Sequence, residues 1–167
     1  MLQRLARLRV PLGFLSAAVA LWLVQPTSTS LAVGMAIALA GEAIRVWAAG
    51  HIDKGREITT SGPYRFVRHP LYCGSAVIGI GFAVASRSWL VVGIVVLYLG
   101  LTLMAAIRTE EATLDNRFDG EYTEYREGRL AVTARRFQWV RAWKNREYRA
   151  VVGLAVVTGF LIVRVWW

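Results

Sequence analysis

Cysteine and histidine are scarce in this chain. Cys73 is the only cysteine, so the chain can form no internal disulfide and no cysteine-rich metal site. His51 and His69 are the only histidines, and no further Cys or His exists to complete a metal site around them. The residue types that most often hold transition metals are therefore too few, and we expect no metal centre.

Acidic residues are also few. The chain has 11 Asp and Glu against 20 Lys and Arg, which gives a net charge of +9, yet 56% of its 167 residues are hydrophobic. Nucleic-acid binding is not expected, because the basic residues flank apolar runs rather than form one stripe. A small integral membrane protein that faces anionic lipid accounts for both the apolar composition and the positive charge. The length fits one domain, residues 1–167.

The apolar residues fall into five runs, which predict an all-α bundle of about five transmembrane helices. The runs cover residues 10–24, 30–49, 70–85, 89–107 and 150–167. A span needs about 20 residues, so the first run is short unless its Arg-rich start extends it. We expect it to be a retained first helix, since no small-residue cleavage site follows. The short connection 86–88 predicts a tight hairpin between the third and fourth helices.

Basic residues predict the orientation in the membrane. They concentrate before the first run and in the connections 50–69 and 108–149, whereas Arg87 and Arg164 are the only ones expected on the opposite side. The N-terminus and both connections are then cytoplasmic, and the C-terminus is extracytoplasmic. We expect the inner (plasma) membrane of a bacterium, with loops and amphipathic helices forming a site on the cytoplasmic face and a core at about 50–130.

Residues 61–72 combine turn signals with cationic and aromatic side chains. Gly62-Pro63 predicts a turn, and Pro70 suits the first position of the third helix. His69 then lies at a helix N-terminus, where free N–H groups and the helix dipole favour an anion, and Arg68 reinforces that preference. The segment therefore predicts an anion-binding helix start; a basic juxtamembrane loop is the alternative.

Two adjacent carboxylates, Glu110 and Glu111, close the fourth run. At a helix C-terminus they would oppose the dipole, so we expect the helix to continue past the membrane until Asp119-Gly120 breaks it. Residues 111, 114, 118, 122 and 125 then form one amphipathic stripe. A carboxylate at the membrane edge is costly to bury without a partner, which favours a functional role over a solvated acidic turn.

Glu42 and Arg45 lie three residues apart inside the second run. At this spacing they are predicted to pair on one helix face. A lining role for Arg45 in a lipid cavity is the alternative. His51 follows the same run, where a hydrogen-bonding or interfacial role is expected.

Two motifs together resemble a known superfamily of membrane enzymes. The first reads Gly62-Pro63-Tyr64-Arg65-Phe66-Val67-Arg68-His69-Pro70-Leu71-Tyr72-Cys73-Gly74. About 36 residues later come Glu110-Glu111-x-x-Leu114 and Phe118-Asp119-Gly120-Glu121-Tyr122-x-x-Tyr125. Over roughly residues 45–130 the chain resembles the isoprenylcysteine carboxyl methyltransferase and phospholipid methyltransferase superfamily, integral membrane enzymes that use S-adenosylmethionine.

The resemblance implies site residues by position. The positions that match the family's cofactor contacts are Arg56, Glu57, Ile58, Thr59, Tyr64, His69, Pro70, Leu71, Tyr72 and Glu110. To these we add His51 and Arg68 as candidate cofactor-binding residues. Glu111 is a candidate catalytic base, and Arg108 a candidate substrate contact, although the strict match to the family's substrate-binding arginine is Ala106.

The cofactor's chemistry fits these residue types. Glu110 suits its amino group, His69 and the helix start suit its carboxylate, and Tyr64 or Tyr72 suits its adenine or sulfonium. The resemblance further implies a lipophilic acceptor that enters from the bilayer, with membrane lipids as surroundings. The oligomeric state is not specified.

The reaction expected is methyl transfer most like that of isoprenylcysteine carboxyl O-methyltransferases, because a carboxylate acceptor needs no general base. Three alternatives stay open at this point: a phosphatidylethanolamine-type phospholipid N-methyltransferase, an NADPH-dependent membrane reductase of the sterol-reductase type, and a non-enzymatic membrane scaffold.

Overall fold

The fold is built from helices, as the apolar runs predict. The computed structural model describes residues 2–118, 120–132 and 135–167, and within this part of the chain no strand occurs. The elements in chain order are α1 Leu2–Leu23, α2 Ser28–His51, the 3₁₀ helix η1 Gly62–Arg65, α3 Pro70–Ser86, α4 Trp89–Arg117, α5 Glu121–Arg126, α6 Trp139–Lys144 and α7 Tyr148–Trp166.

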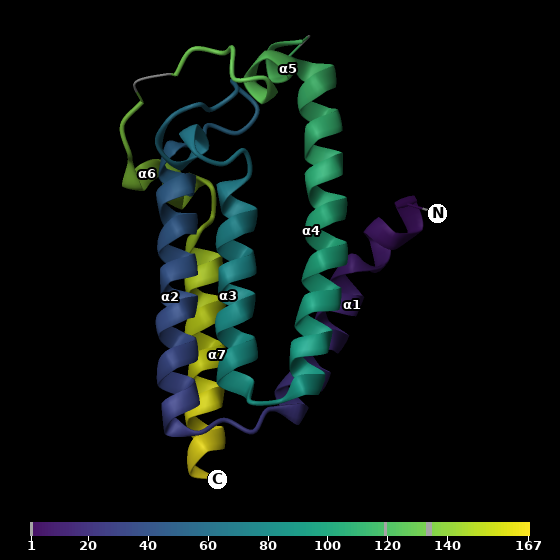
Figure 1. Ribbon diagram of the computed structural model, residues 1–167, viewed down its shortest axis with the longest axis vertical. Helices are drawn as coiled ribbons and strands as arrows, with labels where there is room; N and C mark the ends of the chain where they lie inside the picture. The colour runs from purple at the N-terminus through teal and green to yellow at the C-terminus, as the bar shows by residue number, and fades with distance from the viewer. Residues whose placement is uncertain (1, 119, 133–134) are drawn as a thin grey trace.

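The long helices form a bundle with the long connections gathered at one end (Figure 1). Helices α2, α3 and α7 lie side by side, and α4 with α1 forms a second group that joins them through the α3–α4 hairpin. The connection 52–69 and the described residues between α4 and α7 meet at the end where α5 and α6 lie, while the short connections 24–27 and 87–88 lie at the other. The two polar connections therefore share one end of the bundle, as expected.

Among the described residues, the helices α2, α4 and α7 are long and apolar enough to cross a membrane. Two further apolar stretches are shorter, α3 Pro70–Ser86 and Gly13–Leu23, which is the part of α1 whose side chains the structure describes. The five predicted membrane helices thus correspond to these three candidate spans, to α3 and to α1. These features support an integral membrane protein.

Local signals placed the helix ends correctly. Pro70 is the first residue of α3, with His69 as its N-cap. Helix α4 continues beyond its apolar run to Arg117, which confirms the extension predicted from the paired glutamates. Gly120 has a φ of 90° and is the N-cap of α5, so the predicted break is confirmed there. Asp119 lies outside the described residues.

Reciprocal glycines bring α2 and α3 into close contact. Gly41 faces Gly74, and a Cβ atom built on Gly41 would lie 2.7 Å from the Gly74 carbonyl oxygen. Two turns along, Gly34 faces Gly81, and a Cβ atom built on Gly81 would lie 2.5 Å from the Gly34 carbonyl oxygen. Small residues at such positions let helix backbones approach closely inside a membrane. This contact fixes the start of α3, and with it His69, against α2.

Candidate functional site

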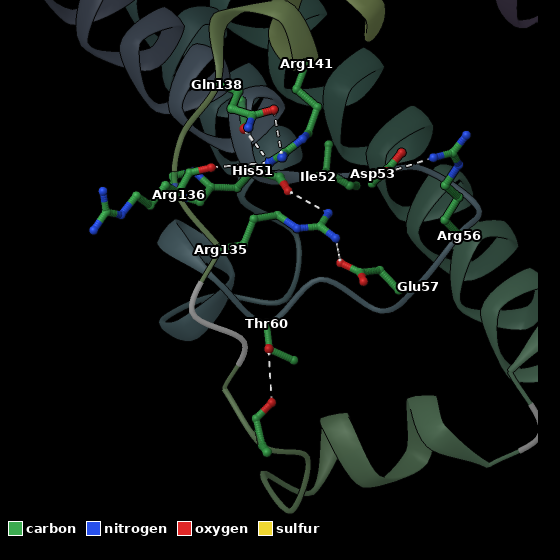
Figure 2. Close-up of polar contacts among 12 residues, drawn as sticks. His51, Ile52, Asp53, Arg56, Glu57, Thr60, Arg135, Arg136, Gln138 and Arg141 are labelled. Atoms are coloured by element: carbon green, nitrogen blue, oxygen red, sulfur yellow. Dashed lines mark hydrogen bonds and ion pairs between the residues drawn. The ribbon is translucent and has the colours of Figure 1, made fainter.

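The connection 52–69 is tied down by the chain that follows α5. We call described residues 129–132 and 135–138 the strap. The Thr60 hydroxyl donates to the Ala131 carbonyl oxygen at 3.1 Å. Arg135 forms an ion pair with Glu57 (Figure 2). The Gln138 N–H donates to the Gly50 carbonyl oxygen at 3.1 Å, which joins the strap to the end of α2. Most of this connection is irregular, so contacts distant in sequence hold it in place.

His51 supports η1 from below. It is 6% exposed, and its Nδ1 lies 2.9 Å from the Trp47 carbonyl oxygen. Its ring packs against Gly62, which has a φ of 58° and has no room for a side chain. His51 is not among the residues that line the cavities described below. The structure therefore places this candidate under the site rather than in its wall.

Most predicted cofactor-binding residues surround one cavity of about 630 Å³, here called the loop cavity. The connection after α2, η1 and the start of α3 form one side, and the polar end of α4 with α5 forms the other. Its predicted lining residues are Glu57, Ile58, Thr59, Tyr64, Arg68, His69, Tyr72 and Glu110. The size is ordinary for a small-molecule or cofactor site, which takes about 300–1,000 Å³.

A second polar cavity, of about 580 Å³, adjoins the first. We call it the turn cavity, because Asn145, Arg146 and Glu147 of the α6–α7 turn and Arg149 of the first turn of α7 line it. The predicted Pro70 and Leu71 line it as well. It shares with the loop cavity Lys54, Tyr64, Arg68, His69, Tyr72 and Glu110. The two spaces are therefore parts of one polar site.

Glu111 anchors the site instead of lining these cavities. Its Oε1 lies 3.0 Å from His69 Nε2 and accepts a hydrogen bond of 3.0 Å from the Tyr122 hydroxyl. Arg68 Nη1 lies 3.9 Å from the same oxygen. Burial, together with the Glu111 carboxylate, raises the pKa of Tyr122 well above its ordinary value, so this hydroxyl stays a donor. Glu111 thus joins α4 to the start of α3 and to α5.

The Glu110 side chain projects from a different side of α4 than that of Glu111. It lines both polar cavities, and within the described residues it has no hydrogen bond or ion pair. The roughly 100° between successive residues of a helix gives the two neighbouring glutamates these separate surroundings. Glu110 therefore offers an unpaired carboxylate to a cation in the cavity.

Two buried hydroxyls in the wall of the loop cavity lack partners in the described structure. These are Tyr64 Oη and Thr59 Oγ1. Burial, and then the neighbouring Glu110, raise the pKa of Tyr64 far above that of a free tyrosine. A buried polar group without a partner costs about 1–3 kcal/mol, so a ligand that hydrogen-bonds to these hydroxyls would offset the cost. The backbone is held independently, since the Tyr125 hydroxyl donates to the Tyr64 carbonyl oxygen at 2.8 Å.

Arg45 connects three helices just below this site. Its Nε donates to Glu147 Oε1 at 2.7 Å, and its guanidinium also bonds Ser75 Oγ and the Leu71 carbonyl oxygen. The predicted partner Glu42 lies farther away, at 3.7 Å. A charged residue inside an apolar run was the signal for Arg45, but Glu147 is 102 residues away in sequence and nothing local identifies it.

Besides His51 and Glu111, two further predicted residues lie outside the cavity walls. The Arg56 side chain is 81% exposed and lies 3.8 Å from Asp53, and Arg108 is exposed on α4. Ala106, the strict match to the family's substrate arginine, does line the loop cavity. The sequence interpretation missed Lys54 and the turn residues Asn145, Arg146, Glu147 and Arg149. In the described part of the chain, no group of three or more His, Cys, Asp or Glu is placed to hold a metal.

Comparisons with known proteins agree with the resemblance seen in the motifs. The chain is 35% identical over 95 residues to the cobalt-zinc-cadmium resistance protein CzcN of Cupriavidus metallidurans, a match that covers 56% of this chain and 42% of that protein. It is 32% identical over 106 residues to the nickel-cobalt-cadmium resistance protein NccN of Alcaligenes xylosoxydans xylosoxydans, a match that covers 62% of this chain and 48% of that protein. The matches span less than half the length of either relative.

No solved structure matches the chain. The profile of the phospholipid methyltransferase family matches residues 11–121, a segment that contains α2, α3, α4, the first sequence motif and the second as far as Glu121. This match confirms the superfamily that the motifs indicate and supports a membrane methyltransferase. The chain belongs to the phospholipid methyltransferase family.

Proposed function

We propose that this protein is an S-adenosylmethionine-dependent methyltransferase of the membrane that binds its cofactor in the loop cavity and methylates a lipophilic acceptor. The observation that carries the proposal is the convergence of Glu110, His69 and Tyr64 on one cavity from three separate elements. Such a set of a carboxylate, an imidazole and an aromatic hydroxyl matches a ligand that carries a cation, an anion and an aromatic base.

The residues present fit this cofactor. Glu110 is an unpaired carboxylate and would hold the amino group, while His69 at the start of α3, with Arg68 and Lys54, would hold the carboxylate. The unpartnered Tyr64 hydroxyl would donate a hydrogen bond to the ribose or adenine, or accept one from it. When bound, S-adenosylmethionine supplies an electrophilic methyl group on its sulfonium.

The protein's own contribution would be orientation and exclusion of water. Methyl transfer needs in-line approach at near-attack distance, so the walls must hold both reactants rigidly. Glu111 would act here as a positioning residue, because its carboxylate holds His69 while Tyr122 holds Glu111. The strap would perform the same task for the connection that carries Ile58 and Thr59.

An oxygen acceptor is our preferred class, as in isoprenylcysteine carboxyl O-methyltransferases. Glu111, the strongest candidate for a general base, is already engaged by His69 and Tyr122. A protonated amine must lose a proton before it attacks, whereas a carboxylate is ready to react. The positive-inside rule favours the cytoplasmic face for this site, and we propose that the acceptor enters laterally from the bilayer.

Isothermal calorimetry with S-adenosylhomocysteine on the protein in neutral detergent tests the proposal. Glu110→Gln removes a charge pair, so its dissociation constant should rise about tenfold to hundredfold. The control Glu124→Gln removes an exposed carboxylate from α5 and should leave binding unchanged. No binding to the folded wild type, or equal binding by both variants, would refute the proposal. Binding of NADPH in place of S-adenosylhomocysteine would instead favour a reductase.

A further inference from the structure

An apolar cavity between the membrane helices adjoins the polar site. This third space, the apolar cavity, has a volume of about 440 Å³ and is lined by residues of α1, α2, α3 and α7. It shares Arg45 and Ala150 with the turn cavity, which in turn shares most of one wall with the loop cavity. The three cavities thus adjoin one another in the order apolar cavity, turn cavity, loop cavity.

The turn cavity carries an excess of positive charge. Five cationic residues line it, Arg45, Lys54, Arg68, Arg146 and Arg149, against the two carboxylates Glu110 and Glu147. Glu147 is already paired with Arg45. No carboxylate of the described residues forms an ion pair with either arginine of the turn, Arg146 or Arg149. These two guanidinium groups therefore remain available to an anion in the cavity.

The apolar cavity complements this charge with a hydrophobic wall. Beyond Arg45 and Ser75, its lining consists of apolar side chains and glycine, among them Leu21, Ile78 and Phe82. Gly153 of α7 contributes an open surface, since a Cβ added there meets no atom within 4 Å. A hydrocarbon chain fits such a wall, and an anionic group at its end would reach the arginines of the turn.

Arg146, Arg149 and α7 all lie beyond the segment 11–121 that matches the family profile. The matched segment supplies the loop-cavity lining except Tyr122 and Tyr125, whereas the free cationic groups lie in the turn after α6 and at the start of α7. The two arginines therefore lie outside the segment that carries the expected cofactor contacts.

We propose that Arg146 and Arg149 bind the anionic head, a phosphate or a carboxylate, of a membrane amphiphile whose hydrocarbon chain lies in the apolar cavity. This amphiphile is the methyl acceptor, an assignment that rests on the proposed function. Guanidinium groups recognise both anions through paired N–H donors, so the two heads share one chemistry.

Native mass spectrometry of the protein released from dodecyl maltoside micelles tests the site with dodecyl phosphate as the probe. We expect a stoichiometric complex with the wild type and about tenfold or weaker binding by the double variant Arg146→Gln/Arg149→Gln. The matched control Lys144→Gln removes one exposed charge from the neighbouring α6, outside the cavity walls, and should bind within about twofold of wild type.

A second pair of variants tests the chain-binding part. Gly153→Leu fills the apolar cavity and should weaken dodecyl phosphate binding, whereas Gly159→Leu adds the same bulk to the same helix outside the lining and should not. Inorganic phosphate alone should bind far more weakly. Equal binding of dodecyltrimethylammonium, or of dodecyl phosphate by the double arginine variant, would overturn the inference.

Binding of S-adenosylhomocysteine, measured on the same samples, separates the two proposals. Retained S-adenosylhomocysteine affinity in the double arginine variant shows that the variant is folded and confines the defect to the head-group site. Arginine-dependent dodecyl phosphate binding without any S-adenosylhomocysteine binding would support the site and refute the proposed function. The reverse pattern would support the proposed function and refute this site.

Discussion

The reciprocal glycine contact between α2 and α3 makes the position of Gly41 sensitive to a single added methyl group. In Gly41→Ala the new Cβ would lie 2.7 Å from the Gly74 oxygen and 2.8 Å from the Ile78 nitrogen, so backbone of α3 would have to move. Overpacking of this kind costs about 1–3 kcal/mol. Alanine also gains about 0.5–1 kcal/mol over glycine inside a helix, which partly offsets the cost.

A matched control isolates the packing part. Gly100→Ala adds the same methyl group to α4, where an added Cβ meets nothing within 4 Å. The gain in helix propensity is common to both variants, so the difference between them should equal the packing cost of about 1–3 kcal/mol. For a chain of this size that difference corresponds to about 2–12 °C in melting temperature.

Thermal unfolding in neutral detergent, followed by circular dichroism at one scan rate, measures this difference. We expect Gly41→Ala to melt below the wild type and Gly100→Ala to melt at or above it. Because the start of α3 would shift with the helix, Gly41→Ala should also bind S-adenosylhomocysteine more weakly. A melting temperature of Gly41→Ala equal to or above that of Gly100→Ala would refute the close α2–α3 contact.

Three further predictions concern the strap and the tyrosines. Arg135→Gln breaks the ion pair with Glu57 and should weaken S-adenosylhomocysteine binding several-fold, as measured by calorimetry. The neighbouring Arg136→Gln should leave this binding unchanged. Equal effects of the two substitutions would contradict a positioning role for the strap. Tyr122→Phe should lower the free energy of unfolding by about 0.5–1.5 kcal/mol in a denaturant titration, through loss of its bond to Glu111, and an unchanged value would contradict that bond. Burial raises the pKa of Tyr64, Tyr122 and Tyr125, so these tyrosines should ionise above the ordinary tyrosine pKa of about 10 in a 295 nm absorbance titration. The stability that they contribute is therefore complete below about pH 10 and is lost as the pH rises toward their folded pKa values. Ionisation of all six tyrosines of the folded protein near pH 10 would contradict their burial.

Local chemistry explains which parts of the fold were predictable. Proline geometry fixed the start of α3 at Pro70, and the helix dipole argument placed Glu110 on an extended α4. Both depend on neighbours within a few residues. Tyr64, His69 and Glu110, which the resemblance grouped into one site, line one cavity, because the resemblance carries long-range information that spacing alone lacks.

Contacts between distant residues were not predictable in this way. Arg45 binds Glu147 and Arg135 binds Glu57, and neither pair shares a helix face or a motif. The role of His51 beneath η1 likewise depends on how the chain returns over the end of α2. The α6–α7 turn was missed because a basic juxtamembrane sequence has the same composition whether or not it lines a cavity.

The central claim is that the protein transfers a methyl group to a lipophilic acceptor. The most direct measurement incubates the protein with methyl-labelled S-adenosylmethionine and its native membrane lipids, and identifies labelled products by mass spectrometry. We predict a lipid-soluble product that carries the label, whose yield falls in Glu110→Gln and is retained in Glu124→Gln. Folded wild-type protein that binds S-adenosylhomocysteine but labels no lipid-soluble molecule, or equal labelling by both variants, would contradict the account.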